Sequence, residues 1–240
     1  MPDATLDPRH IADTVKRLKL RVETRFPASG LSRIALRLTQ VADKASATSR
    51  WIAEPIIGLR IGVWSLVVLI VLGLGVTLTT LPLPKGGLEL AQFIQVLESG
   101  INDVVLIAAA VFFLATVETR IKRHRALGAI HELRSIAHVI DMHQLTKDPE
   151  WVLSRGVGTG HVTRSMTPFE LARYLDYCSE MLSLTGKIAA LYIQRFDDSV
   201  ALQAVNEVES LSNGLARKIW QKLMILYSMH ERDVAPPRAP

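Results

Sequence analysis

The sequence predicts an all-α protein that crosses a membrane twice as a helical hairpin and carries a cytosolic bundle of antiparallel helices. Two apolar runs lie in the middle of the chain, the flanking segments repeat apolar residues at helical spacing, and no segment has the alternation of a half-buried strand. The predicted domains are basic amphipathic cytosolic helices over residues 1–54, a transmembrane hairpin over 55–119, a cytosolic helical bundle over 120–233 and a disordered tail over 234–240.

Residues 1–54 are predicted to form two amphipathic helices. Their apolar positions recur at spacings of three and four residues, the period of one helix face. These positions are Ile11, Val15, Leu18 and Val22 in the first helix and Leu31, Ile34, Leu38, Val41 and Ala45 in the second. Four basic residues beside the first stripe are candidates for binding anionic lipid headgroups: Lys16, Arg17, Lys19 and Arg21. The same pattern fits a solvated helix face that packs on the protein itself, and both interpretations stay open.

The two apolar runs are predicted to be membrane spans. The first covers residues 58–81, and its residues 61–81 include no charged side chain. Those 21 residues suffice for a helix that crosses a membrane, which needs ~20. The second span, residues 101–119, is weaker, because only 14 uncharged residues separate Asp103 from Glu118. They make about 21 Å of helix against a hydrocarbon core of about 30 Å.

The charges on either side of the spans favour the membrane interpretation and give an orientation. Four cations follow the second span directly: Arg120, Lys122, Arg123 and Arg125. The outer loop over 82–100 has one basic residue, Lys85, and is expected to include a short helix in the far interface. Lys and Arg accumulate on the cytosolic side, so we expect a multi-pass protein of the cell membrane with its N- and C-termini in the cytoplasm. The helix of the second span is expected to continue to Leu145, because no proline interrupts it.

Two long helices are predicted to complete the bundle. Thr167, Pro168 and Glu170 have the spacing of a capping box with Pro in the first turn, which predicts a helix start. One face of this helix would hold Leu171, Leu175, Cys178, Leu182, Ala189 and Tyr192 or Ile193. The final helix is expected to continue through residues 213–214 with a kink at most, since its apolar stripe stays in phase. The glycine-containing loop 147–166 is long, and we expect it to be functional or mobile.

Composition limits the class of partner. The net charge is +5, and residues 1–60 hold 11 Lys and Arg against 6 Asp and Glu, an excess as large as that of the whole chain. A basic flank beside an apolar run is typical of a cytoplasmic membrane border, so nucleic acid is not an expected partner. Cys178 is the only cysteine, which excludes an intramolecular disulfide.

Polar residues near the ends of the spans are candidate functional residues. Asn102 and Asp103 could form a polar membrane or pore site, because an ionisable residue within a span is costly. They could instead cap the second span at the outer interface, and we favour capping because they lie near its end. Arg60 and Glu118 lie at the inner ends of the two spans and could form an intramembrane pair. Snorkelling of Arg60 into the headgroups is the alternative.

Three histidines recur at intervals of seven residues: His124, His131 and His138. Seven helical residues rise about 10.5 Å, too far for two of these side chains to share one metal ion at about 2 Å per bond. We therefore predict no metal site and no cofactor. Solvated or oligomer-contact roles are expected for these histidines.

The tetrapeptide His-Glu-Leu-Arg at 131–134, followed by Ser135, resembles the phosphoacceptor box of sensor histidine kinases. In that family a helical histidine accepts a phosphoryl group and the adjacent acidic residue assists, so the resemblance implies these roles for His131 and Glu132. Ile136 stands where the family usually has proline, and no ATP-binding domain follows. These departures exclude a kinase and leave a stand-alone phosphotransfer helix as the implication.

The leading functional prediction is a non-enzymatic, homo-oligomeric integral membrane protein that acts as a membrane-anchored helical scaffold or signalling component. Its expected partners are the lipid bilayer and other copies of itself. The alternative is a small homo-oligomeric ion channel with Asp103 near the outer mouth, where a ring of carboxylates would attract cations. Phosphotransfer through His131 is the third hypothesis.

Overall fold

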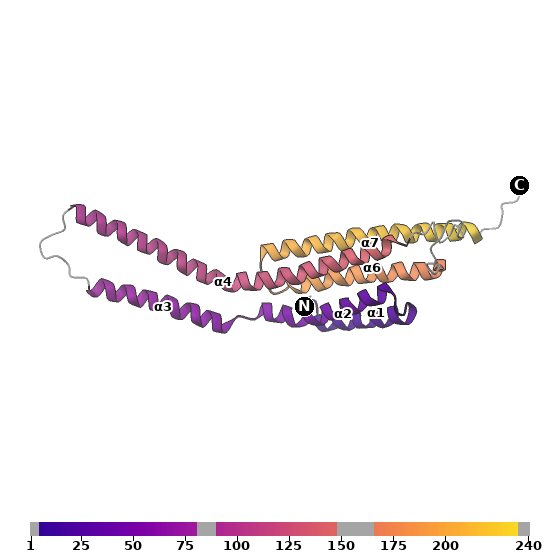
Figure 1. The fold of residues 1–240 in the computed structure, drawn as a ribbon, viewed down its shortest axis with the longest axis horizontal. Coiled ribbons are helices and arrows are strands. Elements are labelled where there is room, and N and C mark those ends of the chain that lie inside the picture. Colours follow the sequence, from indigo (N-terminus) through magenta and orange to yellow (C-terminus); the bar gives the residue numbers. More distant parts are fainter. Residues whose placement is uncertain (1–4, 81–89, 148–165, 235–240) are drawn as a thin grey trace. The chain divides into compact units, whose positions relative to one another are not determined.

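The computed structural model describes residues 5–80, 90–147 and 166–234, and all the regular structure of these residues is helical, as the sequence predicts (Figure 1). The helices are α1 (Pro8–Arg25), α2 (Gly30–Ala53), α3 (Ile57–Thr80), α4 (Leu90–Leu145), α6 (Pro168–Leu191) and α7 (Ser199–Val234). The chain divides into two compact units, one of residues 1–53 with 125–240 and one of residues 54–124, and α4 contributes to both. The sequence prediction treated the first two helices as a segment of their own, whereas they belong to the same unit as α6 and α7.

Helices α1 and α2 bury the stripes that their sequences predict. Every predicted apolar position in the two helices is less than 9% exposed. Asp7 caps α1 by accepting a hydrogen bond from the backbone N–H of Arg9 at 2.8 Å, and Pro8 occupies the first turn. Ala28, with a φ of 56°, lies in the turn that reverses the chain between the helices. The two helices therefore pack on each other and on α6.

Helix α6 is the core helix of this unit, and Figure 1 shows it between α7 and the α1–α2 pair. The predicted capping box is present, because Thr167 accepts from the N–H of Glu170 while the Glu170 side chain accepts from the N–H of Thr167. Burial extends to many residues that the predicted stripe does not include. These are Ala172, Tyr174, Tyr177, Met181, Leu184, Thr185, Gly186, Ile188 and Leu191. The neighbouring helices thus leave little of α6 exposed.

Helices α4 and α7 complete the unit. The inner face of α4 buries Ala126, Ile130, Leu133, Ala137 and Ile140. Helix α7 begins where Asp198 accepts from the N–H of Ala201 at 2.9 Å, and it runs without a break through residues 213–214, as predicted.

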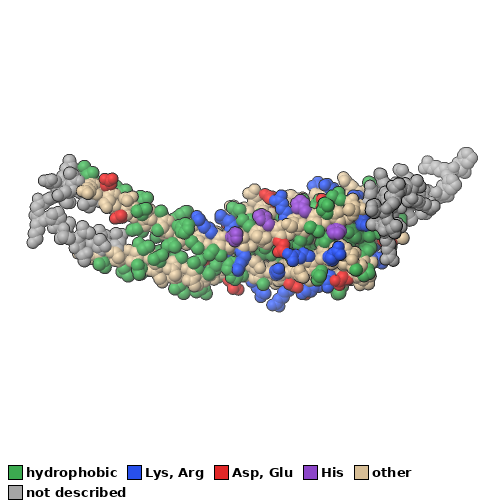
Figure 2. All heavy atoms as spheres, in the orientation of Figure 1, with side chains coloured by type: hydrophobic (Ala, Val, Ile, Leu, Met, Phe, Trp, Pro, Cys, Tyr) green, Lys and Arg blue, Asp and Glu red, His purple; other side chains and the backbone are tan. Residues whose placement is uncertain are grey.

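The second unit contains α3 and the first part of α4, and both helices are long and apolar enough to cross a membrane. No residue of their most apolar segments is buried. Trp64 is 67% exposed, Leu69 67% and Phe112 69%. In Figure 2 hydrophobic side chains cover most of this part of the surface, with a few Asp or Glu side chains among them, while Lys, Arg and His side chains gather on the rest of the molecule.

The structure corrects the prediction for the start of the second span. We expected an outer loop as far as residue 100 with a separate short helix in it, but α4 begins at Leu90 and is continuous from there. The rest of that predicted loop, the glycines of the predicted 147–166 loop and the predicted tail from residue 235 lie outside the described residues.

Candidate functional site

Glu118 of α4 is the centre of a polar cluster in the unit of residues 54–124. Its Oε2 accepts a hydrogen bond from Arg60 Nε at 2.6 Å, and its Oε1 accepts from Arg60 Nη2 at 3.3 Å. Lys122, one turn further along α4, places its Nζ 2.8 Å from Oε1. The backbone N–H of Ile56 also donates to Oε1, at 3.2 Å. The structure therefore brings together the two residues that the sequence proposed as a pair, and it adds Lys122 and Ile56.

The cluster fixes the start of α3 against α4. Ile56 directly precedes α3, so Glu118 satisfies one of the backbone N–H groups that a helix start leaves without an internal partner. A carboxylate at this position also interacts favourably with the positive end of the helix dipole. The side chain of Glu118 is 14% exposed and that of Lys122 is 8% exposed, so each charge depends on the other. The (i, i+4) spacing of Glu118 and Lys122 is a sequence signal that could have identified this second ion pair.

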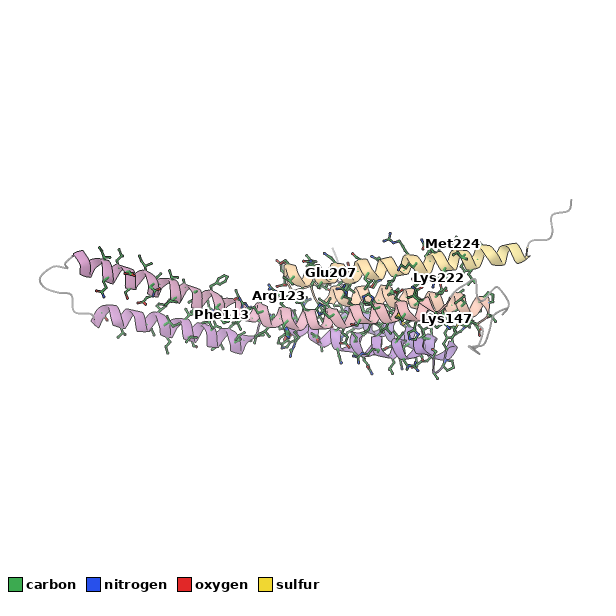
Figure 3. The ribbon with its side chains drawn as sticks, turned by 45° about the horizontal axis from the view of Figure 1, so that its top comes forward. Phe113, Arg123, Lys147, Glu207, Lys222 and Met224 are labelled. Carbon is green, nitrogen blue, oxygen red and sulfur yellow. The ribbon has the colours of Figure 1, made fainter. Side chains whose placement is uncertain are left out.

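Two further arginines follow Glu118 on α4. Arg120 stacks its guanidinium over the Phe113 ring, with 5.0 Å between Cζ and the ring centroid. Arg123 follows on the same helix, and Figure 3 labels it together with Phe113. Arg60 and Lys122 are thus the cations that contact the Glu118 carboxylate, while Arg120 and Arg123 follow Glu118 along α4.

Asn102 and Asp103 do not cap α4. They lie well inside a helix that begins at Leu90, and both side chains are exposed. The capping prediction was wrong because α4 already begins at Leu90, twelve residues before Asn102. The two polar side chains therefore lie on the surface of an apolar helix.

The two residues of the proposed phosphoacceptor pair have different surroundings, and their proposed roles stay a prediction. His131 is exposed, whereas the neighbouring carboxylate of Glu132 accepts a hydrogen bond at 2.5 Å from Arg37 of α2. Ser135 donates its hydroxyl to the backbone carbonyl of His131. His124 and His138 are exposed as well, and the described residues include no group of three or more side chains placed to hold a metal ion.

The basic residues proposed to bind anionic lipid have partners within the protein. Lys16 pairs with Asp43 of α2 at 3.0 Å, Lys19 with Glu23 at 3.2 Å, and Arg21 with Glu180 of α6. Arg17 donates to the hydroxyl of Thr14 at 3.4 Å. These contacts fit the interpretation in which the basic face of α1 packs on the protein itself, and lipid binding by these residues stays a prediction.

Sequence reasoning missed Lys222 of α7, which binds the end of α4. Its Nζ donates to the backbone carbonyl of Gln144 at 2.7 Å and to that of Lys147 at 3.3 Å (Figure 3). The last carbonyls of a helix have no partner within it, so this lysine acts as a C-terminal cap from another helix. No local pattern predicts such a contact, because it joins residues 75 or more positions apart.

Cys178 is buried in the core of the unit that contains α6 and α7. Burial raises the pKa of its thiol to about 12, which outweighs the opposite effect of the Lys222 charge. A buried thiol of this kind packs as a small apolar side chain.

The chain matches no protein-family model, no curated protein and no solved structure.

Proposed function

We propose that this chain is a two-pass integral protein of the cell membrane that acts as a non-enzymatic, membrane-anchored helical scaffold or signalling component. Helices α3 and α4 would form the transmembrane hairpin, and the unit of α1, α2, α6, α7 and the last part of α4 would be a cytosolic bundle. The observation that carries this proposal is the surface of α3 and of the first part of α4, on which large apolar side chains are exposed.

In water this surface would be unfavourable. Exposed apolar area costs about 25 cal/mol per Å², and soluble monomers rarely expose contiguous apolar patches larger than a few hundred Å². Hydrocarbon removes that cost, and two helices can satisfy their own backbone hydrogen bonds there. Cations gather where the two apolar segments end, at Arg60, Arg120, Lys122 and Arg123. They support an orientation with these ends at the cytosolic face, which would place both termini in the cytoplasm.

Self-association is part of the proposal. The exposed Asn102 and Asp103 side chains lie on an otherwise apolar helix, and a carboxylate that faces lipid is expensive. A second copy packed on this face would remove both side chains from lipid. We therefore propose a homo-oligomer.

Cysteine labelling in intact cells tests the topology. In a Cys178→Ser background, a cysteine at Gly86 should react with an impermeant thiol reagent added from outside. Cysteines at Gln40 and Ser210, both exposed in the cytosolic unit of the proposal, should react only after lysis. Reaction of Gln40→Cys or Ser210→Cys in intact cells would contradict the hairpin with cytoplasmic termini.

A homo-oligomeric ion channel is the second candidate function, and one observation favours it. Asp103 is exposed within α4 rather than at its end, so several copies around an axis could present a ring of carboxylates. Phosphotransfer through His131 has less support, because the adjacent carboxylate of Glu132 is bound to Arg37.

A further inference from the structure

A cavity of about 310 Å³ lies where the residues before α1 meet the ends of α2 and α6, and we call it the end cavity. Its volume is at the lower end of the range of small-molecule sites, about 300–1,000 Å³. All the residues that line it belong to the unit of residues 1–53 with 125–240. Those with polar or charged side chains are Thr5, Asp7, Ser49, Arg50, Gln194 and Arg195.

Two guanidinium groups of the end cavity are available to an anion. Arg50 donates its Nε to the backbone carbonyl of Ser46 at 3.1 Å, which leaves its two terminal amino groups. In the part of the chain that the structure describes, neither Arg50 nor Arg195 forms an ion pair with a carboxylate. A guanidinium presents its N–H donors in a planar fork that matches the oxygens of a carboxylate or a phosphate. Two such groups on one cavity favour a phosphate ester, because it offers three strong acceptor oxygens.

The amide oxygen of Gln194 adds a requirement for a hydrogen-bond donor. This Oε1 atom is buried and accepts no hydrogen bond from any residue that the structure describes. A buried acceptor without a donor is destabilising, and most such atoms in proteins have a partner. Asp7 accepts from the N–H of Arg9 through Oδ1, and its Oδ2 is a second acceptor on the cavity wall. The end cavity therefore suits a ligand that carries donors as well as an anionic group.

Hydroxyl groups are the donors that fit best. The end cavity also has the hydroxyls of Thr5 and Ser49, which both donate and accept hydrogen bonds. A ligand hydroxyl can match them in either direction, whereas an ammonium group only donates.

We propose that the end cavity binds a small organic phosphate with hydroxyl groups, with the phosphate on Arg50 and Arg195 and a hydroxyl on Gln194 Oε1. Glycerol phosphate represents this chemistry, which occurs free in solution and in the headgroup of phosphatidylglycerol. A lipid source has to be considered because Ala53, on the cavity wall, lies four residues before the start of α3 at Ile57. Binding of the free phosphate does not depend on the proposed membrane anchoring.

The test compares two ligands by isothermal titration calorimetry with the full-length protein in a non-ionic detergent and a phosphate-free buffer. The ligands are glycerol 3-phosphate and propyl phosphate, which has the same carbon chain without hydroxyls. The wild type should bind glycerol 3-phosphate about tenfold more tightly, because only this ligand supplies a donor to the buried Gln194 Oε1. Gln194→Leu should bind the two with nearly equal affinity. A wild type that binds neither ligand at millimolar concentration, or both equally, overturns the proposal.

Nanodiscs distinguish the two sources of the ligand. The affinity of the wild type for glycerol 3-phosphate is measured in phosphatidylcholine nanodiscs that contain equal proportions of either phosphatidylglycerol or phosphatidylserine. Phosphatidylserine supplies the same net charge without the glycerol hydroxyls. Weaker binding with phosphatidylglycerol than with phosphatidylserine assigns the site to the lipid headgroup, and equal binding assigns it to the free phosphate.

A matched set of arginine variants tests the place of binding. Arg50→Gln and Arg195→Gln should each weaken the binding of both phosphates about tenfold, because each removes a charge-assisted hydrogen bond to the phosphate. Arg33→Gln removes the same charge from an exposed position of α2 outside the end cavity and should change neither affinity. Circular dichroism should show equal helix content in all three variants. Equal weakening in all three would indicate only non-specific attraction of anions and would overturn the assigned site. The membrane anchor, which the cysteine labelling tests separately, would be unaffected.

Discussion

At Glu118 one carboxylate accepts hydrogen bonds from Arg60 and from the N–H of Ile56 and pairs with the nearly buried Lys122. Glu118→Gln removes the charge but keeps the size, so Lys122 loses its counter-charge. Breaking a buried ion pair costs 3–5 kcal/mol, and because part of the cluster is exposed we expect a smaller loss, about 1–3 kcal/mol of unfolding free energy. The free energies of unfolding of the wild type and the variant can be compared in mixed micelles, with circular dichroism as the probe of unfolding.

Two variants check the reason for that loss. Glu98→Gln removes an exposed carboxylate from the same helix and should have little effect. Lys122→Met in the Glu118→Gln background removes the cation left without its counter-charge and should restore part of the stability. If Glu98→Gln destabilises as much as Glu118→Gln, the cluster has no special role.

His143 near the end of α4 gives the stability of the bundle a pH dependence. Burial, with the charges of Arg33 and Lys147, lowers the pKa of this histidine below its ordinary value, and a Cβ at Gly30 would overlap its imidazole. The unfolded chain binds the proton at the ordinary histidine pKa of about 6.5. The unfolded state thus binds more protons between the two pKa values, and stability rises with pH across that window.

We therefore expect the melting temperature to be highest above about pH 6.5 and to decrease as the pH falls through the lowered pKa of His143. His143→Asn should flatten this slope, and His10→Asn, at an exposed position of α1, should preserve it. Thermal melts between pH 5 and pH 7.5 provide the comparison. An unchanged slope in His143→Asn would assign the pH dependence to other groups.

Burial was predictable for the helices that are covered along one face, and only partly predictable for α6, which is covered on several faces. The stripe from Ile11 to Val22 lies against the rest of its unit on one face only, so its apolar spacing reports its burial directly. Helix α6 packs against α1, α2 and α7, and it therefore also buries Tyr174 and Tyr177, which lie outside its apolar stripe. Burial of this kind depends on which helices pack together, and the spacing of apolar residues within one helix does not predict that.

The polar residues of the two apolar segments were predictable only in part. The pairing of Arg60 and Glu118 could be anticipated because both end an apolar run, and an antiparallel arrangement would bring those ends to similar depth. The start of α4 was placed too late because Asp103 has the residue type of a cap, while the helix continues beyond it to Leu90. Residue type alone does not separate a cap from a polar residue inside a helix.

The contact of Lys222 with the end of α4 gives a prediction for that helix. Lys222→Met keeps the aliphatic stem but leaves the carbonyls of Gln144 and Lys147 without this donor. Hydrogen bonds to charged groups contribute about 1.5–3 kcal/mol, and we expect a loss at the lower end because Lys222 is half-buried. Amide hydrogen exchange should accelerate in the last turn of α4. Lys218→Met, at an exposed position of the same helix, should not change it.

For the whole molecule, the choice between scaffold and channel depends on Asp103. The scaffold predicts no single-channel current from the protein in planar bilayers under varied voltage, pH and membrane tension. The channel predicts a cation current that Asp103→Asn reduces severalfold at low salt, since the substitution removes one charge per copy from the ring. The reduction should be smaller at high salt, because the Debye length falls from about 10 Å at 0.1 M to 3 Å at 1 M.

The position of Asp103 inside α4 makes the effect of Asp103→Asn easier to interpret. Because Asp103 lies inside α4, Asp103→Asn does not remove a helix cap, and any change in current reports on charge. Asn102→Ala is the matched control, since it alters the adjacent polar side chain without altering charge. We expect no current from the wild type or either variant. A cation current that falls in Asp103→Asn but persists in Asn102→Ala would replace the scaffold with a channel, whereas equal currents in all three proteins would indicate a pore without an acidic ring.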